Sequence, residues 1–216
     1  MEFIGQFIDI VLHLDVHLTQ LLQQYGAWVY GILFVIVFCE TGLVVTPFLP
    51  GDSLLFVAGT VAASGAGLEI GPLTGVLLAA AVIGDNTNYW IGRWAGKRIL
   101  HWGNGRLINR AAFDRTHAFY ERHGGKTLAI GRFMPLVRTF APFVAGMARM
   151  TYPRFFVFDC GGGVAWIFSL CLAGYWFGNL PAVRGNLSLV IIGIVAVSLI
   201  PVAIGWLRRN RQVGEP

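Results

Sequence analysis

The chain has 216 residues, of which 56% are hydrophobic and only 12% are charged, and its formal net charge at pH 7 is +5. This usage is far from that of soluble globular domains, and several windows of about 20 apolar residues fit the hydrocarbon core of a bilayer. The composition therefore excludes an ordinary soluble domain and predicts an integral membrane protein.

The amino-terminal segment, residues 1–26, is expected to lie beside the membrane core without crossing it. Residues 3–22 carry apolar side chains at helical spacing, with Asp9, His13 and Gln20 off the stripe. This pattern predicts an amphipathic helix along the interface or packed against the helical bundle. The segment contains neither Lys nor Arg, so it lacks the basic start of a cleavable signal peptide.

Further along the chain, continuous apolar segments alternate with interrupted ones. The continuous segments have the length of spanning helices and comprise residues 27–46, 72–92, 155–177 and 187–207. Residues 48–64 and 127–148 are also apolar, but proline, glycine and charged residues interrupt them. Because proline removes backbone donors and breaks helices, we expect broken hairpins in these two segments.

Basic residues predict the orientation of the chain, because Lys and Arg collect in cytoplasmic loops. Residues 93–126 contain eight of them and the tail 208–216 contains three, so the basic loop and the C-terminus are both expected in the cytoplasm. Within the loop, residues 109–123 predict a short amphipathic helix. Three apolar stretches separate the loop from the tail, so one of them must enter and leave on the same face. We assign this re-entrant path to residues 127–148.

An internal repeat supports this topology. Three strings recur in order at offsets of 85, 87 and 86 residues: Phe48-Leu49-Pro50 as Phe133-Met134-Pro135, Phe56-Val57-Ala58-Gly59 as Phe143-Val144-Ala145-Gly146, and Tyr89-Trp90-Ile91-Gly92 as Tyr175-Trp176-Phe177-Gly178. Each copy is a broken hairpin followed by a span, the first within residues 27–92 and the second within 127–177, and the two open from opposite faces. The sequence thus predicts a single membrane domain, residues 1–216, with an all-α polytopic fold. The fold has an inverted-topology repeat, two re-entrant helical hairpins, spanning helices and interfacial amphipathic helices.

Small residues within two of the spans predict close helix contacts. Gly92 and Gly96 are four residues apart, and so are Gly174 and Gly178. This small-xxx-small spacing lets helix backbones approach one another in membranes.

Charged side chains inside the apolar segments are the candidate functional residues, because charge is costly at membrane depth. Arg132 and Arg138 lie in the second broken segment, while Glu40 precedes the first and Asp52 lies at its break. We expect the hairpins to face each other and to set the two arginines against the two acids around a polar cavity. A guanidinium keeps its proton there and matches phosphate oxygens with parallel hydrogen bonds, while nearby carboxylates could exchange protons near neutral pH.

Two further acids, Asp85 and Asp159, lie within the predicted spans. Asp85 and Asn88 share one helical face, so Asp85 is a third proton-coupling candidate that could instead serve polar contacts between helices. Asp159 is expected to be an interfacial partner of nearby basic side chains such as Arg154. An alternative is that the arginines and acids have no role in transport, and that they neutralise one another and hold the hairpins in place.

The sequence predicts neither an enzyme nor a cofactor site. Cys39, Cys160 and Cys171 lie in apolar runs without metal-ligand or redox spacing, so we interpret them as packing residues. No nucleophile–base constellation and no metal-ligand cluster is evident, and nothing indicates a nucleic-acid partner. Whether the chain forms a homo-oligomer is left open.

Four features together resemble a known family: Glu40, PFLPGD at residues 47–52, GDNTNYWIGRWAG at 84–96 and GRFMPLVRTFAPFVAGM at 131–147. In order and spacing they resemble the DedA family of bacterial inner-membrane proteins, from about residue 25 to residue 180. The family is similar to eukaryotic lipid scramblases, and bacterial members are implicated in recycling undecaprenyl phosphate. The resemblance implies a multi-pass inner-membrane protein that moves this lipid from the outer to the inner leaflet in a proton-linked step. It also implies essential acids at Glu40 and Asp52 and essential arginines at Arg132 and Arg138.

Two alternatives to a phosphate-lipid transporter stay open at this stage. The first is a proton-coupled transporter of small soluble ions, including oxyanions such as selenite or cationic drugs, with a water-filled path. The second is a non-catalytic membrane-organising protein, in which apolar residues could replace the ion pairs without loss of function.

The inverted repeat can be tested by labelling. Cysteines placed one at a time near Asp52 and near Pro135 should react with small polar thiol reagents from opposite membrane faces, because the two hairpins open in opposite directions. A cysteine in the basic loop reports the cytoplasmic face. If both hairpin positions are labelled from one face alone, the inverted-repeat hypothesis is wrong.

Overall fold

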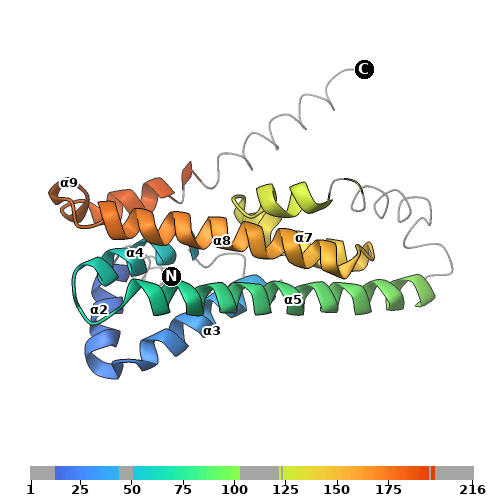
Figure 1. The fold of residues 1–216 in the computed structure, drawn as a ribbon, viewed down its shortest axis with the longest axis horizontal. Helices are drawn as coiled ribbons and strands as arrows, with labels where there is room; N and C mark the ends of the chain where they lie inside the picture. The colour runs from blue at the N-terminus through green and yellow to red at the C-terminus, as the bar shows by residue number, and fades with distance from the viewer. Residues whose placement is uncertain (1–12, 44–50, 103–121, 123, 195, 198–216) are drawn as a thin grey trace, which may run out of the picture. The chain divides into compact units, whose positions relative to one another are not determined.

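The computed structural model describes residues 13–43, 51–102, 122, 124–194 and 196–197, and all regular secondary structure within them is helical (Figure 1). Residues 124–131 and 187–194 are helical. The named helices are α2 (Leu14–Tyr25), α3 (Trp28–Gly42), α4 (Gly51–Ala63), α5 (Ile70–Trp102), α7 (Pro135–Met147), α8 (Tyr152–Phe177) and α9 (Pro181–Arg184). The described residues therefore confirm the all-α fold class.

Two of these helices are long and apolar enough to cross a membrane, namely Ile70–Gly96 within α5 and Tyr152–Phe177, which is α8. They lie at the predicted spans 72–92 and 155–177. In addition, α5 continues to Trp102 as one unbroken helix (Figure 1), so the first part of the predicted basic loop is helical. The chain contains no proline between residues 93 and 102, so nothing in this stretch forces the helix to end.

The other predicted segments are described only in part. The interfacial segment 3–22 appears as α2, which buries Leu18 and Leu22 and packs against α4, so its described part lies against the protein. Helix α3 occupies most of the predicted span 27–46 but is only 15 residues long. The amphipathic helix predicted at 109–123 lies outside the described residues except for residue 122, and so does most of the final span beyond residue 194.

The second interrupted segment is broken where the sequence predicts. Residues 124–131 are helical, residues 132–134 form a turn, and α7 begins at Pro135. Proline suits the first position of a helix, because its missing N–H would have no partner there. The break of the first segment, residues 44–50, lies outside the described residues, and α4 follows it from Gly51. Entry and exit of either hairpin on one membrane face stays a prediction.

The chain divides into two compact units assembled from separated pieces. Unit 1 comprises Met1–Leu33, Pro50–Val76 and Ile167–Pro216, and unit 2 comprises Phe34–Leu49 and Leu77–Trp166. Helices α5 and α8 contribute to both units, so neither unit is a continuous stretch of sequence. That the whole chain acts as one membrane domain stays a prediction.

Within unit 1, α4 packs closely against the carboxyl-terminal part of α8. A Cβ added at Gly59 would overlap the backbone carbonyl of Cys171, and one added at Gly174 would overlap that of Phe56. The hydroxyl of Thr60 donates to the carbonyl of Gly174 at 3.2 Å. Glycine is thus required on both helices for this backbone approach.

Within unit 2, α7 packs against α5 through the same pattern. A Cβ at Gly146 would overlap the carbonyl of Tyr89, one at Gly92 would overlap that of Phe143, and one at Gly96 would lie 3.0 Å from the carbonyl oxygen of Met147. The predicted close contacts at Gly92, Gly96, Gly174 and Gly178 are therefore confirmed.

These contacts also correct the register of the internal repeat. Phe56 and Gly59 correspond to Phe143 and Gly146, an offset of 87 residues, as the sequence indicates. In the spans, however, Gly92 corresponds by contact to Gly174, an offset of 82 residues, whereas the matched strings place Gly92 opposite Gly178. The strings match aromatic identity, but the glycines determine where backbones meet. Since the two glycines of each span are four residues apart, the string match is wrong by about one helical turn.

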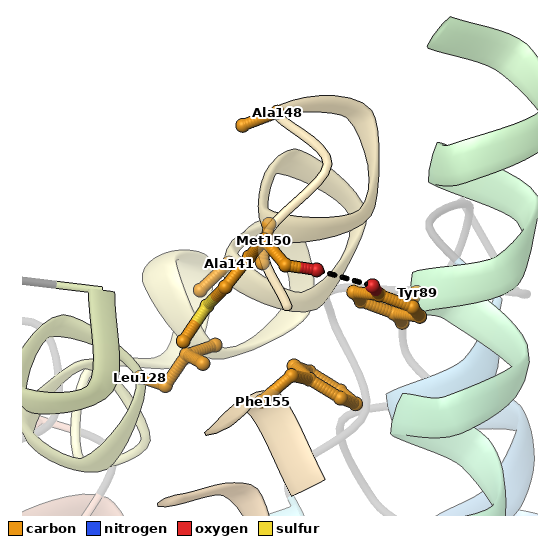
Figure 2. Close-up of a cluster of buried hydrophobic side chains, with 7 residues drawn as sticks. Tyr89, Leu128, Ala141, Ala148, Met150 and Phe155 are labelled. Carbon is orange, nitrogen blue, oxygen red and sulfur yellow. Dashed lines mark hydrogen bonds between the residues drawn. The ribbon is translucent and has the colours of Figure 1, made fainter. Parts of the chain in front are cut away.

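The hydrophobic core of unit 2 holds α5, α7 and the start of α8 together (Figure 2). The hydroxyl of Tyr89 donates to the carbonyl of Met150 at 2.6 Å, and its ring stacks on Phe155 with centroids 4.4 Å apart. Leu128 and Ala141 also belong to this core. The turn at residues 132–134 is thereby fixed between two packed segments.

The glycine contacts predict a clear difference between substitutions. Gly59→Ala and Gly174→Ala should each destabilise the protein by about 1 to 3 kcal/mol, because the new methyl group must push two helix backbones apart. Gly75→Ala is the control, since a Cβ there meets nothing within 4 Å and alanine favours the helix by about 0.5 to 1 kcal/mol. Thermal unfolding in detergent measures the difference. If all three variants are stabilised alike, the close contact between α4 and α8 is wrong.

Candidate functional site

Arg138 of α7 forms a buried ion pair with Glu40 of α3. Its Nη2 lies 2.5 Å from Glu40 Oε1, and its guanidinium carbon lies 4.3 Å from the ring centroid of Trp166 on α8. A carboxylate and an aromatic face are both favourable neighbours for a guanidinium. The structure thus brings together one of the arginines and one of the acids that the sequence predicts to meet. We call Arg138 and Glu40 the Arg138 pair.

Arg132 lies in the turn before α7 and contacts two acids. Its Nη2 is in contact with Asp85 Oδ2 and lies 3.3 Å from Asp159 Oδ1, while its Nη1 donates to the backbone carbonyl of Asp159 at 2.6 Å. The exposed fractions of Arg132, Asp85 and Asp159 are only 3%, 1% and 4%. We call these three residues the Arg132 cluster.

The position of Asp159 corrects its predicted interfacial role. Asp159 is buried against Arg132, whereas Arg154 donates to the carbonyl of Arg122 at 3.1 Å. Five residues separate Asp159 from Arg154, which places them about 140° apart around an ideal helix. Their proximity in sequence therefore does not make them neighbours. The sequence feature that indicates a close neighbour at this part of the helix is the glycine run Gly161–Gly163, which follows Asp159 and Cys160.

Two of these glycines provide the surface against which Arg132 lies. A Cβ at Gly163 would be 2.8 Å from Arg132 Nη1, and a Cβ at Gly162 would be 3.4 Å from Arg132 Cδ. At Gly161 a Cβ would meet nothing within 4 Å. The glycine surface of α8 therefore admits the long arginine side chain beside the helix backbone.

Asn88 holds the backbone beside the Arg138 pair. Its Nδ2 donates to the carbonyl of Thr41 at 3.2 Å and to that of Thr139 at 2.7 Å. These carbonyls directly follow Glu40 and Arg138 in sequence. Because Asp85 lies one turn before Asn88 on α5, a single polar face of this helix serves both ion clusters, as the spacing of the two residues indicates.

Asp52, the remaining predicted site residue, lies in the first turn of α4 and is half-buried. It belongs to unit 1, whereas Glu40, Asp85, Arg132 and Arg138 belong to unit 2. Its approach to the arginines therefore stays a prediction.

The two ion clusters differ in charge. In the Arg138 pair one positive charge meets one negative charge, whereas in the Arg132 cluster one guanidinium is shared by two carboxylates. Among the described residues, Asp85 Oδ1, Asp159 Oδ2 and Asn88 Oδ1 are buried acceptors without a hydrogen-bond partner. The described part of the chain contains no group of three or more His, Cys, Asp or Glu residues that could hold a metal ion. The site therefore offers guanidinium groups to an anion and carboxylates to protons.

Comparison with known proteins gives consistent matches. The VTT domain matches residues 49–176, a range that contains every charged residue of the two clusters except Glu40. The chain is 50% identical over 216 residues to Protein DedA of Escherichia coli (strain K12), covering 100% of this chain and 99% of that protein. It is 42% identical over 198 residues to the membrane protein Rv0364 of Mycobacterium tuberculosis (strain H37Rv), with coverage of 89% and 87%. It is 38% identical over 183 residues to the inner membrane protein YqjA of Escherichia coli (strain K12), with coverage of 76% and 80%. No solved structure matches the chain.

The glycine surface of α8 can be tested with a matched pair of variants. Gly163→Ala should displace the Arg132 guanidinium from Asp85 and Asp159, and disruption of a buried ion pair costs about 3 to 5 kcal/mol. Gly161→Ala adds the same methyl group to an open position of the same helix, so its stability should be unchanged or slightly higher. Thermal unfolding of both variants measures the effect. Equal stability would show that Arg132 does not depend on Gly163.

Proposed function

Because this chain belongs to the DedA family of membrane proteins, we propose that it translocates a phosphate-bearing polyprenyl lipid across the bacterial inner membrane in a proton-coupled step. Undecaprenyl phosphate is the proposed lipid. The observation that carries the proposal is the burial of Arg132 and Arg138, each in contact with carboxylates, among helices apolar enough for a membrane. The basic loop 93–126 and the tail 208–216 are proposed to face the cytoplasm.

The lipid phosphate is the anion that this site would bind. A guanidinium donates parallel hydrogen bonds to two phosphate oxygens, and its planar fork makes this recognition specific. Arg138 is already oriented, since it lies over the ring of Trp166. The polyprenyl tail would stay in the bilayer, so the protein needs to shield only the head group from hydrocarbon.

Proton coupling would follow from competition for the same guanidinium groups. Glu40 and Asp85 contact the nitrogens that phosphate oxygens would contact. A carboxylate that takes up a proton loses its charge and releases the arginine, which can then bind phosphate. A carboxylate that loses its proton regains the arginine and expels the lipid. Asp52, in the first turn of α4, is proposed as a further proton carrier.

The proposed function can be tested in liposomes containing the purified chain and a labelled polyprenyl phosphate. Wild type should move the lipid between leaflets, and an imposed pH gradient should accelerate the movement. Arg138→Lys keeps the charge but loses the fork, so it removes about one charge-assisted hydrogen bond worth 1.5 to 3 kcal/mol. Transport should then fall at least about tenfold, since 1.4 kcal/mol corresponds to a factor of ten.

Arg149→Lys is the control. Arg149 is exposed beyond the end of α7, so this substitution should leave transport unchanged. Wild-type transport by Arg138→Lys would count against recognition by the guanidinium fork. Movement of free phosphate or selenite, with the labelled lipid remaining in its leaflet, would favour a transporter of small oxyanions.

A further inference from the structure

The Arg132 cluster contains more acid than base. Asp85 of α5 and Asp159 of α8 both contact Arg132, and the described residues offer no second cation in ion-pair contact with either acid. With both carboxylates ionised, the cluster carries one net negative charge. All three side chains are at least 95% buried, so water cannot screen this charge.

The surroundings do not balance the charge. Helices α7 and α3 carry one charged residue each, Arg138 and Glu40, and these two form an ion pair with each other. On α8 itself, the neighbour of Asp159 is the half-buried thiol of Cys160, which is neutral unless it loses its proton. The excess negative charge therefore belongs to Asp85 and Asp159.

The hydrogen bonds of the two acids support the same conclusion. Asp85 Oδ1 and Asp159 Oδ2 are buried and have no partner among the described residues. A buried carboxylate oxygen without a donor is unfavourable, and a bound proton removes both the charge and the unmet acceptor. Each acid therefore binds Arg132 through one oxygen and has a second oxygen on which a proton can reside.

We propose that Asp85, Asp159 and Arg132 form a proton-binding site, in which the two carboxylates share one proton and Asp159 is a proton carrier. This inference rests on the proposed function for the identity of the coupled anion. With one shared proton the cluster is neutral; with a second it is positive and can accept one negative charge of a phosphate. Binding of the anion should therefore take up about one proton from solution.

Calorimetric titration of the full-length chain with a short-chain polyprenyl phosphate tests this linkage. Measuring the binding heat in buffers of different ionisation enthalpy gives the number of protons taken up. Wild type should take up about one proton per phosphate bound. Replacing both carboxylates, by Asp85→Asn together with Asp159→Asn, leaves Arg132 positive without a bound proton, so this double variant should take up fewer than half as many protons.

Two further variants separate a proton carrier from a structural residue. Asp159→Glu together with Asp85→Asn keeps one ionisable group and should restore proton uptake, whereas Glu69→Gln changes an exposed acid in unit 1 and should leave proton uptake as in wild type. Asp159→Asn should be about as stable as wild type, because it leaves Asp85 and Arg132 as one pair of opposite charges, the same net charge as the cluster with its shared proton. An unfolded Asp159→Asn would contradict the proposal, because the charged carboxylate would then be needed to hold Arg132.

Other outcomes overturn the proposal directly. They are zero proton uptake by wild type, undiminished uptake by the double variant Asp85→Asn with Asp159→Asn, or phosphate binding that responds to sodium at fixed pH, because sodium would then balance the charge. Infrared spectroscopy of the protein alone keeps the test independent of the lipid. A carbonyl band of a protonated carboxylic acid that is present in wild type and weakened in Asp159→Asn supports the site even if no polyprenyl phosphate binds. Absence of that band from wild type overturns the site, whatever the lipid does.

Discussion

Two permanent positive charges buried among apolar helices determine the organisation of unit 2. A guanidinium cannot lose its proton at neutral pH, so each arginine requires anionic or aromatic neighbours within the protein. Arg138 finds them on α3 and α8, and Arg132 finds them on α5 and α8. Helices from separate parts of the sequence must therefore meet closely. Glycines make this approach possible, both where α3 ends against α5 at Gly84 and where Arg132 lies on α8.

The packing of the two units repeats, but their charges do not. In each unit a short helix packs against a long one through glycines on both partners, with α4 on α8 in unit 1 and α7 on α5 in unit 2. The helix of unit 2 carries Arg138, whereas the helix of unit 1 carries Asp52 in its first turn. Close approach of two helix backbones requires glycine at only a few positions. Both units can therefore have the same helix contact although their other side chains differ. One scaffold thus holds cations in one copy and an acid in the other.

The two arginines are held in different ways, and this difference bears on the proposed transport cycle. Arg138 contacts the carboxylate of Glu40 and the ring of Trp166, an arrangement that suits orientation of an anion. The guanidinium of Arg132 contacts two buried carboxylates, those of Asp85 and Asp159. Two carboxylates that share one guanidinium carry a net negative charge when both are ionised. Binding of a proton to one of them removes this unfavourable charge. An anion site at Arg138 and a proton site at Arg132 would then lie six residues apart on one broken segment, and α5 would connect them through Asp85 and Asn88.

The apolar composition, the prolines and the order of local motifs were sufficient to predict the membrane character, the all-helical fold class, an interruption within residues 127–148 and the family. The sequence also identified Glu40, Asp85, Arg132 and Arg138 as buried charges worth attention, and the glycine pairs as contacts. Which acid contacts which arginine depends on the tertiary structure. Spacing along a helix shows that Asp85 and Asn88 share a face, but it does not show which helix lies opposite that face. Local spacing therefore places Asp159 at the interface and aligns the repeat one turn out of register, because neither pattern contains the rotation of α8 against its neighbours. That rotation depends on packing between residues far apart in the chain, which no local pattern encodes.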